Sequence, residues 1–192
     1  MSKERLSAFT DAILAIIMTI LVLELKKPEA ADWASLWALR SDFFSYAVSF
    51  FWLGAMWVNI HNQWSKIEKI DNKVLWWSII MLFFASFFPY VTSFVSNHFT
   101  SLFAQMFYSV VVISVSLSNM ALGQAVARAN GSMNALDYSS RKIVAADLII
   151  KGVGIILAIF VYPPITMFAV ILAGCIVTFL PHIVNRKKQE TR

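Results

Sequence analysis

The stretch RLSAFTDAILAIIMTILVLELKKP, residues 5–28, decides the fold class of this chain. Its apolar run covers only 12 residues, Ala12 to Leu23, and it lies between two acids, Asp11 and Glu24. A helix that faces lipid needs about 20 mostly apolar residues to cross the hydrocarbon core. Ionisable side chains inside a membrane normally face protein or water. The stretch therefore predicts a helix at the centre of an assembly, beside a water-filled path.

The composition of the whole chain is that of an all-α integral membrane protein. Of its 192 residues 59% are hydrophobic and 14% are charged, and the mean hydropathy is +0.68. Soluble domains have about 45–50% apolar and about 25% charged residues. The apolar stretches are too long for the strands of an outer-membrane barrel, which alternate over about 10 residues. The composition therefore predicts a bundle of membrane-spanning helices.

Six transmembrane helices fit the pattern of apolar stretches and polar links. We expect them at residues 5–25, 36–65, 73–96, 100–128, 141–161 and 165–184, in one six-helix domain covering residues 1–192. With both termini in the cytoplasm, the inner segments contain twelve basic residues and the outer loops contain three. This asymmetry follows the positive-inside rule. The basic residues thus report topology in a multi-pass plasma-membrane protein surrounded by lipid, and they do not indicate a nucleic-acid partner.

The first helix has an aliphatic stripe along one side. Phe9, Ile16 and Leu23 are seven residues apart, Ile13 and Ile20 lie beside them, and Thr19 flanks the same stripe. At about 100° per residue, Asp11 points about 140° away from Ile16. If the stripe faces a central axis, Asp11 faces neighbouring helices. Plain helix packing is the alternative explanation of the same periodicity.

Two further groups of polar residues fall inside predicted helices. Trp57 and His61 are four residues apart near the cytoplasmic end of the second helix, so they share a face, and His61 could hydrogen-bond Asp11. Asp147 and Lys151 have the spacing of a helical ion pair. Pairing lowers the cost of placing either charge in a membrane. We interpret the second group as structural rather than as a transport relay.

No pattern in the sequence indicates an enzyme. The chain lacks HExxH, a phosphate loop and GxSxG, and it lacks a carboxylate cluster for two metals. Its single cysteine, Cys175, excludes an intrachain disulfide and a cysteine-based metal site. We expect no cofactor, no small-molecule substrate and no metal beyond a permeating ion. There is also no TVGYG-like filter of backbone carbonyls.

Several motifs together resemble the transmembrane-protein-175 family of potassium channels. That family has an arginine followed by Phe-Ser-Asp, an apolar run and a threonine in its first helix. The matching residues are Arg5, Phe9-Thr10-Asp11, the run with Ile16 and Thr19, Trp57 with His61, the Ile70-Asp71 link and Ser86-Phe87-Phe88-Pro89. The chain departs from the pattern at Thr10, Asn62 and Ser78.

The resemblance implies a homotetramer in which four first helices line a central pore that conducts K⁺. It implies a hydrophobic constriction at Ile16, further rings at Ile20 and Leu23, and selectivity at Thr19. Six residues would anchor the first helix against its neighbours: Arg5, Phe9, Thr10, Asp11, Trp57 and His61. A narrow aliphatic ring that excludes water forms such a gate, and without a carbonyl cage we expect moderate K⁺ selectivity.

Two other functions remain open at the level of the sequence. A pore that dewets for ions can still relay protons, so the chain could form a proton-permeable channel in which Asp11 and His61 titrate. Alternatively, it could be a non-conducting membrane scaffold whose charged first helix only mediates assembly.

Overall fold

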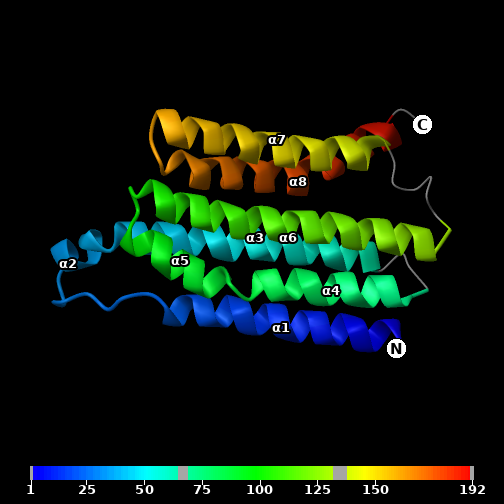
Figure 1. Cartoon of the computed structure of the whole chain (residues 1–192), viewed down its shortest axis with the longest axis horizontal. Helices are drawn as coiled ribbons and strands as arrows, with labels where there is room; N and C mark the ends of the chain where they lie inside the picture. Colours follow the sequence, from blue (N-terminus) through cyan, green and yellow to red (C-terminus); the bar gives the residue numbers. More distant parts are fainter. Residues whose placement is uncertain (1, 65–68, 132–137, 191–192) are drawn as a thin grey trace.

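The computed structural model describes residues 2–64, 69–131 and 138–190. Within these ranges the chain forms eight α-helices: α1 Lys3–Leu23, α2 Trp33–Ala38, α3 Arg40–Trp64, α4 Asn72–Ala85, α5 Phe88–Asn97, α6 Leu102–Ala129, α7 Tyr138–Phe160 and α8 Ile165–Glu190. The long helices run side by side, with α1 at one edge of the bundle and the α7–α8 hairpin at the other (Figure 1). The described N-terminal and C-terminal segments lie at the same end of the bundle.

The predicted membrane class is confirmed by the length and composition of these helices. In the described residues, four helical stretches are long and apolar enough to cross a membrane: Lys3–Leu23, Arg40–Asn62, Asn72–Asn97 and Leu102–Ala129. A shorter apolar helix covers Ile165–Val177. The chain is therefore an all-helical, multi-pass protein, and the count of six spans stays a prediction.

The second predicted helix, 36–65, was expected to be continuous, and this is wrong. The structure has two helices, α2 and α3, separated at Leu39, whose backbone N–H turns back to the carbonyl of Leu36 at 3.1 Å. The helical region also begins earlier than expected, because the Asp32 carboxylate accepts a hydrogen bond from the Ser35 backbone N–H at 2.7 Å and caps α2. An aspartate at this position satisfies backbone donors that the first helical turn leaves free.

The third predicted helix, 73–96, is also broken, between Ala85 and Phe88. The Phe87 N–H bonds the carbonyl of Phe84, three residues back, and α5 begins with Pro89 in its first turn. Proline has no backbone N–H and its ring clashes with the carbonyl four residues earlier, which here belongs to Ala85. The apolar composition of this stretch hid the break, although Pro89 itself was its signal.

The remaining bounds differ from the expectations by small amounts. The predicted helices 100–128 and 141–161 correspond to α6 and α7, and α8 continues beyond the predicted end at residue 184. The predicted polar loop 129–140 falls partly on residues 132–137, and the link 66–72 falls partly on residues 65–68, which lie outside the described residues. Element ends commonly shift by one or two residues between methods of assignment.

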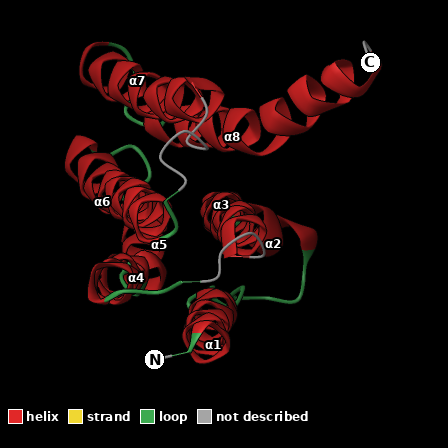
Figure 2. Ribbon diagram, turned by 90° about the vertical axis from the view of Figure 1, so that its right-hand side faces the viewer, coloured by secondary structure: helices red, strands yellow, loops and turns green. Residues whose placement is uncertain are grey.

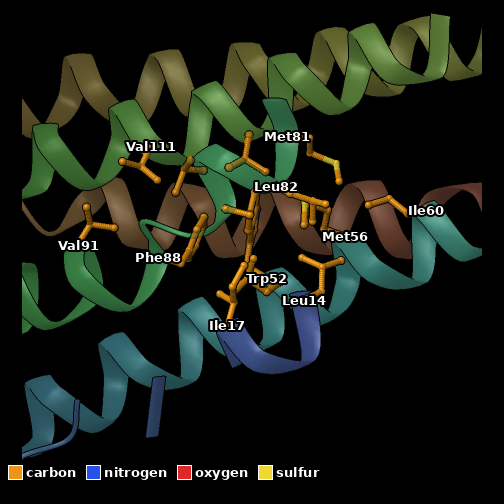
Figure 3. Packing of buried hydrophobic residues seen from close by; sticks show 14 of the residues in the cluster. Leu14, Ile17, Trp52, Met56, Ile60, Met81, Leu82, Phe88, Val91 and Val111 are labelled. Carbon is orange, nitrogen blue, oxygen red and sulfur yellow. The ribbon is translucent and has the colours of Figure 1, made fainter. Parts of the chain in front are cut away.

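The core lies between α1, α3, α4, α5, α6 and the first part of α8. Figure 3 shows Leu14 and Ile17 of α1 meeting Trp52 and Met56 of α3, with Phe88 beside Trp52. The Trp52 and Phe88 rings stack with centroids 5.0 Å apart and an interplanar angle of 11°. This contact holds α3 against the first turn of α5, directly after the break. The packing thus fixes the region on which α1 rests.

The α7–α8 hairpin depends on close backbone approach at Gly154. A Cβ added there would overlap the Cβ of Ala169, whereas a Cβ added at Gly152 would meet no atom within 4 Å. We expect Gly154→Ala to lower the free energy of unfolding by about 1–3 kcal/mol, because added atoms in a packed interface force strain. Gly152→Ala is the matched control, and its better helix propensity should leave stability unchanged or raise it by up to about 1 kcal/mol.

Thermal unfolding of the two variants in detergent micelles tests this prediction. Equal melting temperatures for the two variants would show that α7 and α8 can move apart at no cost.

Candidate functional site

Helix α1 has one face bound to its own chain. Ser2 caps its N-terminus, because the Ser2 hydroxyl accepts a hydrogen bond from the Arg5 backbone N–H at 3.4 Å. The helix packs against α3, α4 and α5. Viewed along the bundle, α1 lies next to α3 and α4 and on the opposite side from α7 and α8 (Figure 2). The buried face of α1 consists of Leu6, Thr10, Leu14, Ile17 and Leu21.

The opposite face of α1 carries the predicted aliphatic stripe, and it is exposed in the single chain. Ile16 is 57% exposed and Leu23 is 79% exposed, and Phe9 and Ile20 are exposed as well. Hydrophobic side chains of this size on one side of a membrane helix require lipid, another subunit or a dewetted pore beside them. These four residues are therefore free for contacts outside the chain. Ile13, which was also expected beside the stripe, is partly buried and packs against the core.

Thr19 lies on the exposed side of α1 next to the stripe. Its hydroxyl donates a hydrogen bond to the carbonyl of Ile16 at 2.8 Å. The hydroxyl hydrogen is thus used inside the helix. Thr19 therefore places a hydroxyl oxygen on the exposed side of α1.

Asp11 contacts α3 through Trp57. The Trp57 Nε1–H donates to one carboxylate oxygen of Asp11 at 2.8 Å, and the Ser7 hydroxyl donates to the other at 3.5 Å. A charged acceptor makes the first of these hydrogen bonds stronger than a neutral one. Asp11 therefore points toward α3, away from the stripe, as the helical periodicity predicts.

The other predicted anchor residues differ in burial and in the contacts that they make. The expected hydrogen bond between Asp11 and His61 is not among the contacts of the described residues, where the His61 ring packs on the Trp57 ring with centroids 5.6 Å apart. Thr10 is buried, but its hydroxyl donates to the Leu6 carbonyl within α1 at 2.9 Å. Arg5 and Phe9 are exposed on α1.

Trp57→Phe tests the contact between α1 and α3. The change keeps an aromatic ring but removes the N–H that donates to Asp11, so we expect a loss of about 1.5 kcal/mol, the low end for a hydrogen bond to a charged group, because the site is partly exposed. Trp76→Phe is the matched control, since Trp76 is an exposed tryptophan on α4. Thermal unfolding in micelles measures both, and a Trp57→Phe protein as stable as the control would contradict an anchoring role.

The predicted pair of Asp147 and Lys151 is confirmed as a buried ion pair. The Lys151 ammonium donates to the Asp147 carboxylate at 2.7 Å and to the Ser116 hydroxyl of α6 at 2.7 Å. It also lies 5.2 Å from the centroid of the Trp52 ring of α3. One lysine thus connects α7 to both α6 and α3, far from the exposed stripe of α1. These contacts support the structural interpretation of the pair.

Sequence reasoning did not assign a role to Glu24, which caps the end of α1 directly after the stripe. Glu24 lines an open cavity of about 410 Å³ together with residues from α5 and its C-terminal end: Tyr90, Ser93, Phe94, Asn97 and His98. The signal was present in the sequence, because an acid follows the last apolar residue of the first span. A carboxylate at this point places negative charge next to the end of the stripe.

Comparisons with known proteins show which family the chain belongs to. Residues 5–89 fit the family model of the endosomal/lysosomal potassium channel TMEM175. A protein of Chryseobacterium sp. named as a potassium channel is 37% identical over 139 residues, which cover 71% of this chain and 71% of that protein. The chain belongs to the TMEM175 family. The family resemblance drawn from the motifs between Arg5 and Pro89 is thereby confirmed.

Two more distant relatives are also similar to this chain, one in sequence and one in structure. A protein of Streptomyces collinus, also named as a potassium channel, is 32% identical over 126 residues, which cover 62% of this chain and 61% of that protein. A crystal structure described as a lysosomal potassium-selective channel TMEM175 homolog from Chamaesiphon minutus matches with a TM-score of 0.70. The match has 21% sequence identity and covers 96% of this chain and 97% of that one. At this identity the structural match establishes the shared TMEM175 fold.

Proposed function

We propose that this chain is the subunit of a homotetrameric, moderately selective potassium channel whose pore is lined by α1. The observation that carries the proposal is the division of α1 into a face packed on α3, α4 and α5 and an exposed aliphatic face. Relatives named as potassium channels, and membership of the family, support potassium as the ion. The whole of residues 1–192 would then act as one six-span channel domain.

The proposed gate is a set of hydrophobic rings along the stripe. Four copies of Ile16 form the constriction, and Ile20 and Leu23 add rings toward the outside. A narrow aliphatic ring sheds water, so a hydrated cation meets a barrier until the ring widens. In the tetramer, four copies of Thr19 place a ring of hydroxyl oxygens toward the pore, and Thr19 is the proposed selectivity residue. Asp11 and Trp57 hold α1 against α3, with the His61 ring packed on Trp57. The family resemblance assigns Arg5, Phe9 and Thr10 to the same anchor.

The channel is proposed to lie in the plasma membrane. Both of its termini are proposed to face the cytoplasm. The two ends of the described chain lie at the same end of the bundle, which supports a common side (Figure 1). The excess of basic residues in the segments at that end supports the cytoplasmic assignment. The permeant ion would be K⁺, with no other cofactor.

Ion flux from liposomes tests the proposed function. Purified protein is reconstituted into vesicles loaded with K⁺ and, separately, with Na⁺, and both ion efflux and proton influx are followed. We expect K⁺ efflux that exceeds Na⁺ efflux, from an oligomer whose mass in native mass spectrometry is that of four chains. Proton flux without K⁺ flux would support the proton leak instead, and a well-folded oligomer without any flux would support the scaffold.

A further inference from the structure

Helix α2, in the connection between α1 and α3, has no buried residue. Side chains at its two ends form hydrogen bonds with its backbone. The Ser35 backbone N–H donates to the Asp32 carboxylate and holds the pKa of that carboxyl below its ordinary value. At the other end the Arg40 guanidinium donates to the carbonyl of Trp37 at 3.3 Å. The helix is thus capped by side chains and packs none of its residues into the core.

The large apolar residues of α2 share one side. Trp33 and Trp37 are one helical turn apart, Leu36 lies between them on the same face, and the small residues Ser35 and Ala38 occupy the other face. Trp33 is 85% exposed and Trp37 is 72% exposed. Two tryptophan rings and a leucine exposed on so short a helix are costly in bulk water, since burying each would gain about 1.5–3 kcal/mol.

The position of α2 relative to the membrane follows from its neighbours. One residue, Leu39, separates it from the membrane-spanning α3, and α2 extends past the end of the bundle (Figure 1). At the end of α7, on the same end of the bundle, Phe160 and Tyr162 are exposed, so apolar surface continues to this level. Helix α2 therefore lies next to a membrane-spanning helix, at the level where the apolar surface of the bundle ends.

We propose that α2 is an interfacial anchor whose Trp33, Leu36 and Trp37 face inserts into the boundary between lipid headgroups and acyl chains. Tryptophan is enriched at this boundary because its ring is apolar and its N–H can still reach water or headgroups. The exposed charges around the helix are of both signs, the basic Lys26, Lys27 and Arg40 and the acidic Glu29 and Asp32, so the anchor rests on the aromatic face and not on net charge. The anchor sets the depth of the connection that leaves α1, and it depends on membrane embedding rather than on ion conduction.

Fluorescent labels on adjacent residues test the anchor. In a Cys175→Ser background, which removes the exposed native thiol, Trp37→Cys and Ala38→Cys are each labelled with bimane and reconstituted into liposomes. Position 37 lies on the apolar face and position 38 on the other, so the second is the matched control. We expect a nitroxide at a shallow acyl position to quench the label at 37 roughly twofold more than at 38, and aqueous iodide to show the reverse order.

Equal quenching by iodide at both positions would overturn the proposal, because α2 would then lie in water. Protection of position 37 from both quenchers would also overturn it, since a second copy of the chain would then cover the face. Should the cysteine variants not fold, Trp33→Phe with Trp37→Phe replaces them, and brominated lipids should quench less of the total tryptophan emission than in the unmodified protein. None of these readouts requires conduction, so a failed anchor and a failed channel function are distinguishable.

Discussion

Ile16→Asn is expected to raise potassium flux from liposomes about tenfold, since a barrier lower by about 1.4 kcal/mol has that effect on a rate. In the proposed tetramer four amide side chains would replace the aliphatic ring and keep water in the constriction. A wetted constriction no longer strips water from a hydrated cation. Ile16→Phe should act in the opposite direction, because a larger apolar ring narrows the same point. The two variants together separate a gate from a general loss of structure.

Val22→Asn is the matched control for the gate. Val22 is 48% exposed on α1 but points away from the side that carries Ile16 and Leu23. It therefore tests whether any asparagine on the exposed surface of the helix changes flux. Unchanged flux in Ile16→Asn, or an equal increase in both asparagine variants, would remove Ile16 from the constriction.

Asp147→Leu is expected to lower the free energy of unfolding by about 3–5 kcal/mol, the cost of leaving a buried charge unpaired. Only 3% of the Lys151 side chain is exposed to solvent. Its ammonium therefore cannot reach water unless α7 moves. Its contacts with Ser116 and Trp52 satisfy only part of its charge. Loss of the pair should therefore loosen α7 from α6 and α3 together.

The double variant Asp147→Leu with Lys151→Met provides the comparison. It removes both charges and keeps similar volume, and such replacements are often close to neutral. Thermal unfolding in micelles of the single and double variants measures the difference. If the double variant is as unstable as Asp147→Leu, the loss of stability comes from packing. The ion pair would then not hold the α7–α8 hairpin against α6 and α3.

The faces of α1 were predictable from sequence because helical periodicity alone divides them. Phe9, Ile16 and Leu23 recur every seven residues, and the structure leaves this side exposed while it buries the side that carries Leu14 and Ile17. The contact between Asp147 and Lys151 was predictable for the same reason, since it lies within one helix. Local geometry in a helix is determined by residue spacing.

The partner of Asp11 was not predictable in this way. Trp57 and His61 share one face of α3, so periodicity allows either to meet α1. The choice depends on how far α1 is shifted along α3, which is set by core contacts such as those of Leu14 and Ile17 with Trp52 and Met56 (Figure 3). A shift of one helical turn, about 5.4 Å, would exchange the two partners.

The sequence by itself determined the membrane class, the apolar stripe of α1 and the ion pair of α7. These depend on composition and on spacing within a single helix. Only the tertiary structure decided that Trp57 holds Asp11, that Lys151 connects three helices, and that α2 stands free of the core with Trp33 exposed. Each of these depends on the relative height and rotation of separate helices, which side-chain packing sets and which no pattern within one segment contains.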